Sequence, residues 1–256
     1  MRNIRVLFVL MITLLVIFGF SVKSQATLTS IGTATYNSLN YNLIYDNDLS
    51  VTWLDYTRGN EGTPIADSWG NQRAWAAGLN GGGVLTYNLN AGVSASWSGD
   101  WRLPTVTDTG SAGCNFSFNG TDCGYNVDTS TGEMAHLFYD ELANKAYFDT
   151  SGASAQPGWG FLNVDIFAKL TEGTYWSDTE SSANSANAWF FTNYNGNQST
   201  SGKLNTYLAM AVRGGGVTFG GGGGASPVPE PSTYLLLGSG IAGLIFWRRK
   251  SLLRKG

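Results

Sequence analysis

The chain has 256 residues, of which 43% are hydrophobic and only 13% are charged. Residues 27–226 hold 17 of the 18 acidic side chains but only 7 of the 15 basic ones. This excess of negative charge argues against a partner that is itself strongly anionic, and so excludes nucleic acid and anionic lipid. The segment is long enough for one domain with a sizeable core.

The N-terminus has the pattern of a secretory signal peptide. Arg2 and Arg5 precede the apolar run 6–20, and small residues follow as far as Ala26. A basic start, an apolar stretch and a small-residue cleavage site predict that signal peptidase removes residues 1–26. An uncleaved N-terminal anchor is the alternative, because the apolar run is long for a signal. Both predict that the chain leaves the cytoplasm.

The first part of the expected domain alternates strands and one helix. Runs rich in β-branched and aromatic residues predict strands over 31–36, 41–45 and 51–55. The segment 69–79 has apolar residues at helical spacing and predicts a helix, which the glycines at 81–83 would end.

A short motif follows at residues 101–105, and its residue types suit a structural role. Two residues apart on a strand, Trp101 and Leu103 would both enter the core, and Pro104 would end the strand. Arg102 would lie on the opposite face and pair with a carboxylate or a carbonyl. Thr105 completes the motif, which we interpret as architecture.

The two cysteines, Cys114 and Cys123, flank a short segment that contains the turn signal Asn119-Gly120. In an exported protein this arrangement predicts a disulfide. A catalytic thiol is the alternative, but the only histidine, His136, shows no pairing with either cysteine.

The second part of the domain continues with a helix and strands. Ser130 and Glu133 fit a capping box, and the rhythm of apolar residues predicts a helix over 133–142 with His136 on its polar side. Strands are expected over 188–192 and 207–212. Residues 214–227 are mostly glycine and predict a flexible linker.

The last residues, 228–256, combine a proline-flanked motif, an apolar segment over 233–247 and a basic end. The apolar segment would form a short transmembrane helix, and the basic residues would stay cytoplasmic. This tail resembles the PEP-CTERM sorting signal of Gram-negative bacteria, which implies processing by an exosortase. An ordinary membrane anchor is the alternative. The sorting motif is Val228, Pro229, Glu230 and Pro231, and the membrane stop is Arg248, Arg249 and Lys250.

The domain itself shows a second resemblance. The order of Trp101-Arg-Leu-Pro-Thr105, the helix near Glu133, Tyr175-Trp-Ser177 and Val212-Arg213 is similar to the C-terminal domain of Legionella collagen-like adhesins. That resemblance implies an α+β, C-type-lectin-like domain over 27–213, with short antiparallel strands and two helices. An N-terminal signal helix and a C-terminal transmembrane sorting helix would flank it.

The sequence offers no catalytic constellation. The chain has one histidine and lacks the spacing of His and Cys that is typical of a metal centre, so no metal site and no cofactor are expected, although an oxygen-only calcium site near Asp46 stays open. Paired carboxylates for glycoside cleavage also stay open, with Asp140-Glu141 and Asp178…Glu180 as candidates. Aromatic residues in Gly- and Ser-rich segments are candidates for stacking on sugars, namely Trp69, Tyr87, Trp97, Tyr125 and Trp159.

These features together predict an exported surface or extracellular-matrix protein of a Gram-negative bacterium that is not an enzyme. It would pass through an inner-membrane intermediate, held by its C-terminal helix until the exosortase acts. At the surface it would bind exopolysaccharide. The alternatives are a purely structural matrix component and a carbohydrate-active hydrolase.

Overall fold

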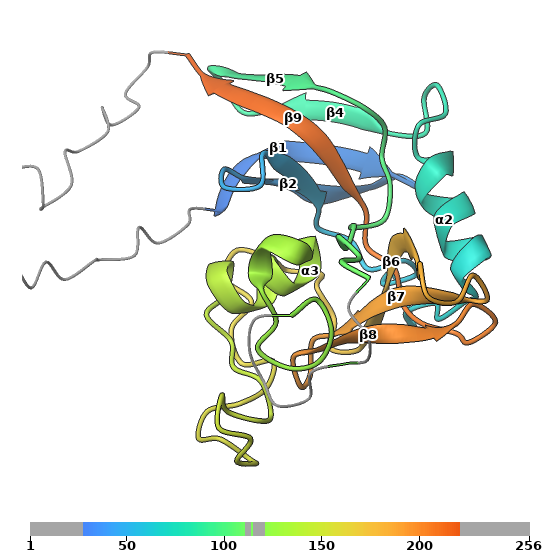
Figure 1. The fold of residues 1–256 in the computed structure, drawn as a ribbon. Coiled ribbons are helices and arrows are strands. Elements are labelled where there is room, and N and C mark those ends of the chain that lie inside the picture. Colours follow the sequence, from blue (N-terminus) through green and yellow to red (C-terminus); the bar gives the residue numbers. More distant parts are fainter. Residues whose placement is uncertain (1–27, 111–113, 115–120, 221–256) are drawn as a thin grey trace, which may run out of the picture. The chain divides into compact units, whose positions relative to one another are not determined.

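The computed structural model describes residues 28–110, 114 and 121–220, and these residues form two antiparallel sheets (Figure 1). The larger sheet has six strands in the order β4-β1-β2-β3-β9-β5. The smaller sheet has three strands in the order β6-β7-β8.

The hairpin of β1 (Leu28–Tyr36) and β2 (Leu39–Asp46) starts the larger sheet. Asn37 and Ser38 connect the two strands with φ values of 49° and 65°, which suits a tight hairpin turn. Strand β3 (Val51–Leu54) pairs with β2 on the other side. The sequence-based prediction of three strands here is therefore confirmed.

Apolar residues cover both faces of this central region. Leu43 and Leu54 belong to one core cluster, whereas Ile44 and Trp53 belong to a second cluster on the other side. Successive side chains of a strand point to opposite faces, so a strand with both faces buried becomes a nearly continuous apolar run. The sheet thus lies in the middle of the core.

Three further strands, from distant parts of the chain, complete the larger sheet. Strand β4 (Thr86–Leu89) pairs with β1 at one edge. Strand β9 (Val212–Phe219) pairs with β3 and lies next to β5 (Val93–Trp97) at the other edge. Figure 1 shows β9, in orange, running from the centre of the fold out along β5.

The glycines of β9 belong to the sheet, although composition alone assigns residues 214–219 to the linker. Gly215 has a φ of 132°, and a Cβ atom there would lie 2.5 Å from the backbone oxygen of Ser96. The segment needs glycine because β5 approaches so closely. The domain therefore extends past 213, the boundary expected from the sequence.

The smaller sheet consists of β6 (Thr174–Glu180), β7 (Asn187–Thr192) and β8 (Asn197–Gly202). Strand β7 agrees with the prediction. Strand β8 has almost only polar side chains and was not predicted. Residues 207–211, which were expected to start a strand, form no ladder of their own but contact both sheets, through the bridge of Leu208 with Tyr175 and the hydrogen bond from the amide of Leu54 to the carbonyl of Ala211 at 3.0 Å.

Two short helices accompany the sheets. Helix α2 (Trp69–Gly78) matches its prediction. Helix α3 (Glu133–His136) follows the 3-10 turn η1 (Thr129–Thr131) and continues as the π-helical turn η2 (Leu137–Glu141). The expected capping box is absent from this region, because Gly132 is the N-cap and makes no side-chain cap hydrogen bond.

The expected α+β, C-type-lectin-like fold is wrong. The described chain is mostly antiparallel β-structure, and its helices are short. Much of the strand content is not apparent in the sequence, because the segments 86–97, 197–202 and 214–219 are polar or glycine-rich. They are held instead by ladder hydrogen bonds to neighbouring strands, which no apolar pattern reveals.

None of the helices in the described part of the chain is long and apolar enough to cross a membrane. The expected signal peptide, at 1–26, and the expected transmembrane segment, at 233–247, both lie outside the described residues.

A substitution in β9 tests its place in the sheet. Gly215→Ala should destabilise the protein by about 1–3 kcal/mol, because the new methyl group meets backbone and the φ angle disfavours a side chain. Gly216→Ala is the matched control, since its Cβ would meet only the Ser96 hydroxyl, at 3.6 Å. Urea unfolding of the two variants compares them. Equal stabilities would contradict the pairing of β9 with β5.

Candidate functional site

An aromatic cluster with exposed members is the most distinctive surface feature of the described chain. Its ring contacts join Tyr125 to Phe148 at 4.9 Å, Phe148 to Tyr147 at 4.9 Å and Tyr147 to Trp159 at 4.8 Å between centroids. Trp159 is 37% exposed and nearby Tyr194 is 44% exposed. We call these five residues the aromatic cluster.

Loop 145–160 carries three members of the cluster, and hydrogen bonds fix its path. Gly160 donates its amide to the carbonyl of Lys145 at 2.9 Å, which closes the loop. The side chain of Gln156 donates to the carbonyls of Ala146 and Phe148 at 2.7 and 2.8 Å. In Figure 1 this loop, in yellow-green, projects from the rest of the domain.

Two other segments bring the remaining members to the loop. Tyr147 donates its amide to the carbonyl of Asn195, directly after Tyr194, at 2.9 Å. Asn126, directly after Tyr125, donates its side-chain amide to the carbonyl of Phe148 at 2.9 Å. The rings are thus presented by backbone that is already hydrogen-bonded.

The cluster provides apolar ring faces next to hydroxyl groups. Burial, and then the neighbouring Tyr194 and Tyr147, raise the pKa of Tyr125, so its phenol stays protonated at neutral pH. Ring faces suit the apolar faces of sugar rings, and phenols exchange hydrogen bonds with sugar hydroxyls.

The other three aromatic candidates from the sequence lie elsewhere. Trp69 is buried, donates its indole N–H to the carbonyl of Ser177 at 2.7 Å and has Arg73 and Lys203 against its ring. Tyr87 and Trp97 are half-buried and pack on each other at 4.7 Å. Of the five aromatic candidates from the sequence, Tyr125 and Trp159 thus belong to the aromatic cluster, while Tyr87 and Trp97 form a separate pair.

Tyr87 and Trp97 support the core rather than face solvent fully. The hydroxyl of Tyr87 accepts a hydrogen bond from the indole of Trp101 at 2.7 Å. The indole of Trp97 donates to the hydroxyl of Thr52 at 3.0 Å, and Arg213 lies over its ring.

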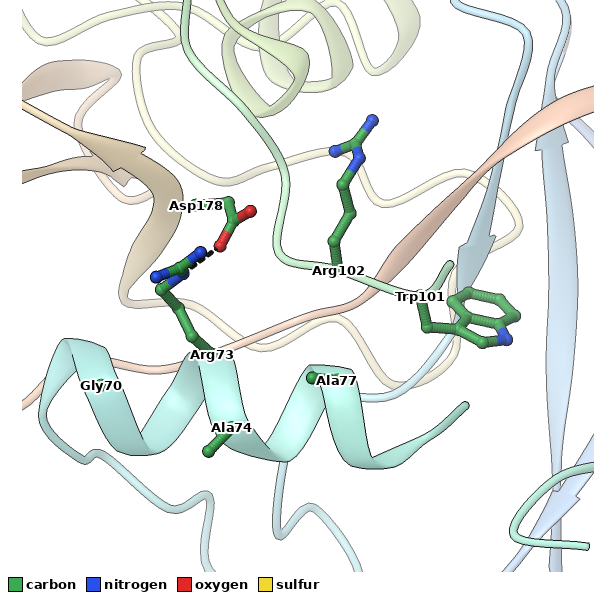
Figure 2. Close-up of a pocket in the computed structure, with 7 residues that line it drawn as sticks. All are labelled: Gly70, Arg73, Ala74, Ala77, Trp101, Arg102 and Asp178. Carbon is green, nitrogen blue, oxygen red and sulfur yellow. Dashed lines mark hydrogen bonds and ion pairs between the residues drawn. The ribbon is translucent and has the colours of Figure 1, made fainter. Parts of the chain in front are cut away.

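A shallow pocket of about 330 Å³ lies between α2, the 101–105 segment and β6 (Figure 2). Asp178 forms an ion pair with Arg73 across it. The pocket therefore offers a neutralised ion pair rather than a free carboxylate. Its lining residues are Gly70, Arg73, Ala74, Ala77, Trp101, Arg102 and Asp178.

The 101–105 segment packs into the core and holds an ion pair. Trp101 and Leu103 are both buried in the first core cluster. Arg102 donates two hydrogen bonds to the carboxylate of Glu133, at 2.6 and 2.7 Å, and a third to the carbonyl of Leu103. Glu133 also accepts the amide of Thr105 at 2.6 Å, and this explains why it is not available as a capping-box residue.

The carboxylates that sequence reasoning left open for glycoside cleavage are all paired with cationic or imidazole groups. Asp178 pairs with Arg73 and Glu180 with Lys203. Asp140 and Glu141 both contact His136. Each of these carboxylates is thus already in contact with another side chain of the domain.

A histidine on the polar side of the helix is expected to be either solvated or hydrogen-bonded, and His136 is hydrogen-bonded, with only 12% of its side chain exposed. It lies beside Glu141 and Asp46, the latter from a turn that sequence reasoning treated as a weak calcium candidate. The only sequence signal for this grouping is the presence of two acidic residues four and five positions after the histidine.

Cys114 and Cys123 form the expected disulfide. Both sulfur atoms lie near the hydroxyl of Ser199 in β8, at 3.3 and 3.6 Å. Cys123 packs with Val106 and Trp189 in a small separate cluster. The bond therefore lies where the 121–132 segment crosses the smaller sheet.

Comparison with known proteins identifies the C-terminal segment. Residues 227–250 match the PEP-CTERM protein-sorting motif. The chain is an exported protein that an exosortase processes, and its destination is the cell surface of a Gram-negative bacterium. The matched range contains Val228–Pro231 and Arg248–Lys250, as expected, although these residues lie outside the described structure.

No curated protein and no solved structure matches the chain. The expected likeness to the Legionella adhesin domain thus finds no support.

The disulfide should stabilise the domain by about 2–3 kcal/mol, the range expected for so short a loop. Reduction by dithiothreitol should therefore lower the midpoint of urea unfolding of the exported protein. A variant with Cys114→Ser and Cys123→Ser is the control, because the reductant should not change its midpoint. Quantitative reaction of the folded wild type with a maleimide would contradict the bond.

Exosortase processing should depend on the proline-flanked motif. In the native host, mature protein should lack Arg254 and Lys255 by intact-mass measurement. The variant with Pro229→Ala and Pro231→Ala should keep them, because the enzyme no longer recognises the tail. A host strain without the exosortase is the control and should also retain the tail. Wild-type protein at the surface with an intact tail would refute this expectation.

Proposed function

We propose that the domain is a non-catalytic module that binds extracellular polysaccharide through the aromatic cluster. The observation that carries this proposal is the exposed pair Trp159 and Tyr194 beside a continuous chain of packed rings. The sorting motif supplies the setting, since export brings the domain to a surface where polysaccharide is abundant.

The exposure of these rings is the first argument. Burying an indole against the core would gain more free energy than leaving it in water, so an exposed cluster has a cost. Contiguous apolar patches on the surface of soluble proteins commonly mark binding sites. Leu162, close in sequence to Trp159, is also exposed, at 67%.

The rigidity of the loop is the second argument. The side chains of Gln156 and Asn126 both donate hydrogen bonds to the carbonyl of Phe148. Less conformational entropy is lost on binding when the contact residues are already held in place. A sugar chain would therefore meet a preformed surface.

The ion pairs of the acidic residues support a role without catalysis. Glycoside hydrolysis needs one protonated and one ionised carboxyl group that face each other across the substrate. Asp178 and Glu180, the candidates next to the pocket, are each salt-bridged to a basic side chain. Both carboxylates therefore serve as partners of basic side chains within the fold.

Retention of the full chain on immobilised exopolysaccharide from the native host tests the proposal. Trp159→Ala should weaken binding by about 5–150-fold, the range for loss of an aromatic contact of 1–3 kcal/mol. Tyr194→Ala should weaken it by a smaller factor. Leu204→Ala is the control, since Leu204 is 91% exposed but lies outside the cluster.

Three outcomes would overturn the proposal. Unchanged retention of both aromatic variants would remove the cluster from the binding surface. No retention of the wild type on any host polysaccharide would favour a purely structural matrix component. Release of reducing sugar ends, abolished by a single Asp or Glu substitution, would make the protein a hydrolase.

A further inference from the structure

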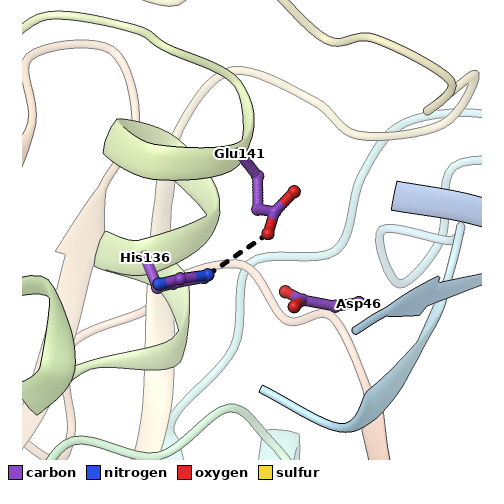
Figure 3. A group of neighbouring side chains, drawn as sticks. All are labelled: Asp46, His136 and Glu141. Carbon is purple, nitrogen blue, oxygen red and sulfur yellow. Dashed lines mark hydrogen bonds and ion pairs between the residues drawn. The ribbon is translucent and has the colours of Figure 1, made fainter. Parts of the chain in front are cut away.

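Three potential metal ligands meet inside the domain, away from the aromatic cluster. Asp46 ends β2, His136 ends α3 and Glu141 ends η2. One ligand atom from each lies within 4.8 Å of the others. Figure 3 shows the imidazole of His136 and the two carboxylates directed toward a shared space.

The π-helical turn creates this grouping. The amide of Leu142 donates to the carbonyl of Leu137, five residues earlier, at 2.9 Å. In a regular α-helix the residues three and four positions on, but not the fifth, would face His136. The wider turn lets Asp140 approach Nδ1 at 3.3 Å while Glu141 approaches Nε2 at 3.2 Å. Such π-turns are rare and often occur at functional sites.

The charges in the cluster are not balanced. Asp46 is fully buried, and the side chain of Glu141 has no exposed surface. Two carboxylates thus face at most one imidazolium. The other contacts of Asp46 are uncharged donors, the amide of Leu49 at 3.0 Å and the indole of Trp53 at 3.4 Å. Burying charge without compensation is costly, and a bound cation would remove that cost.

One oxygen of Glu141 is available to a further ligand. Its Oε1 contacts His136, but its buried Oε2 has no hydrogen-bond partner among the described residues. Buried carboxylate oxygens are nearly always satisfied. An unpaired oxygen beside an imidazole and a second carboxylate is the arrangement that a cation-binding position would present.

We propose that Asp46, His136 and Glu141 bind a divalent transition-metal ion of the Zn²⁺ type. Imidazole nitrogen is a preferred ligand of such ions, whereas Ca²⁺ and Mg²⁺ prefer sets of six or more oxygens. Three protein ligands leave one tetrahedral position, which water or the second oxygen of a carboxylate would fill. Ligand atoms lie about 2.0–2.2 Å from zinc, so small side-chain rotations would complete the site.

Asp140 would act as the outer partner of the histidine. When Nε2 binds the ion, Nδ1 keeps its proton and donates a hydrogen bond to the carboxylate of Asp140. The ion would then join β2 to α3 and η2, two parts of the domain that no strand pairing connects. Its role would be structural, because the ligands are buried.

The test uses the full chain, carrying an affinity tag without histidine and treated with a chelator to remove metal. Because His136 is the only histidine, labelling with ¹⁵N-histidine gives a single imidazole. Titration with Zn²⁺ should shift its Nε2 resonance with one equivalent and raise the midpoint of thermal unfolding.

Glu141→Gln keeps the shape of the side chain and should weaken Zn²⁺ binding at least about tenfold. Glu172→Gln, at an exposed glutamate, is the matched control and should bind as the wild type does. Asp46→Asn is the second test should Glu141→Gln fail to fold. Absence of any Nε2 shift in the wild type at 100-fold excess of Zn²⁺ would overturn the proposal, as would unchanged affinity in a folded Glu141 or Asp46 variant.

Discussion

The ion pair between Arg102 and Glu133 is the contact on which most of the domain depends. The backbone of Arg102 exchanges hydrogen bonds with Val212, at the start of β9, at 2.9 and 3.0 Å. Its side chain holds Glu133, the first residue of α3. One residue thus links the last strand of the larger sheet to the helical region. Breaking such a partly buried pair leaves an uncompensated charge, which destabilises far more than its formation stabilises.

The neighbours of Arg102 extend this link. Trp101 and Leu103 anchor the segment in the core, while the carbonyl of Pro104 accepts the amide of Asp178 from β6. Glu133 in turn fixes where α3 begins, and His136 follows one turn later. The geometry of Asp46, His136 and Glu141 therefore depends on a contact with residues far away in sequence. A metal ion there would reinforce the same region from its other end.

The sequence predicts the local elements well where burial imposes a clear pattern. Strands over 31–55 and helix 69–78 follow from apolar periodicity, and the cysteine pair and the sorting motif follow from spacing. The position of β8 does not, because its polar side chains resemble a loop and only pairing with β7 defines it. The aromatic cluster is equally hidden, since Tyr125, Tyr147 and Tyr194 meet only through tertiary hydrogen bonds. The contact between His136 and Glu141 depends on a single extra residue in a helical turn.

The place of β9 also decides how the domain would bear mechanical load. Strand β9 pairs with β3 through residues 212–214 and lies along β5 towards its end at Phe219, shortly before the sorting motif begins at 227. A pull on the C-terminal end would enter the domain along this strand. The load would first reach the part of β9 that contacts β5 and then the part that β3 also holds. The contact between β9 and β5 is thus the first to be strained when force acts on the C-terminal side of the domain.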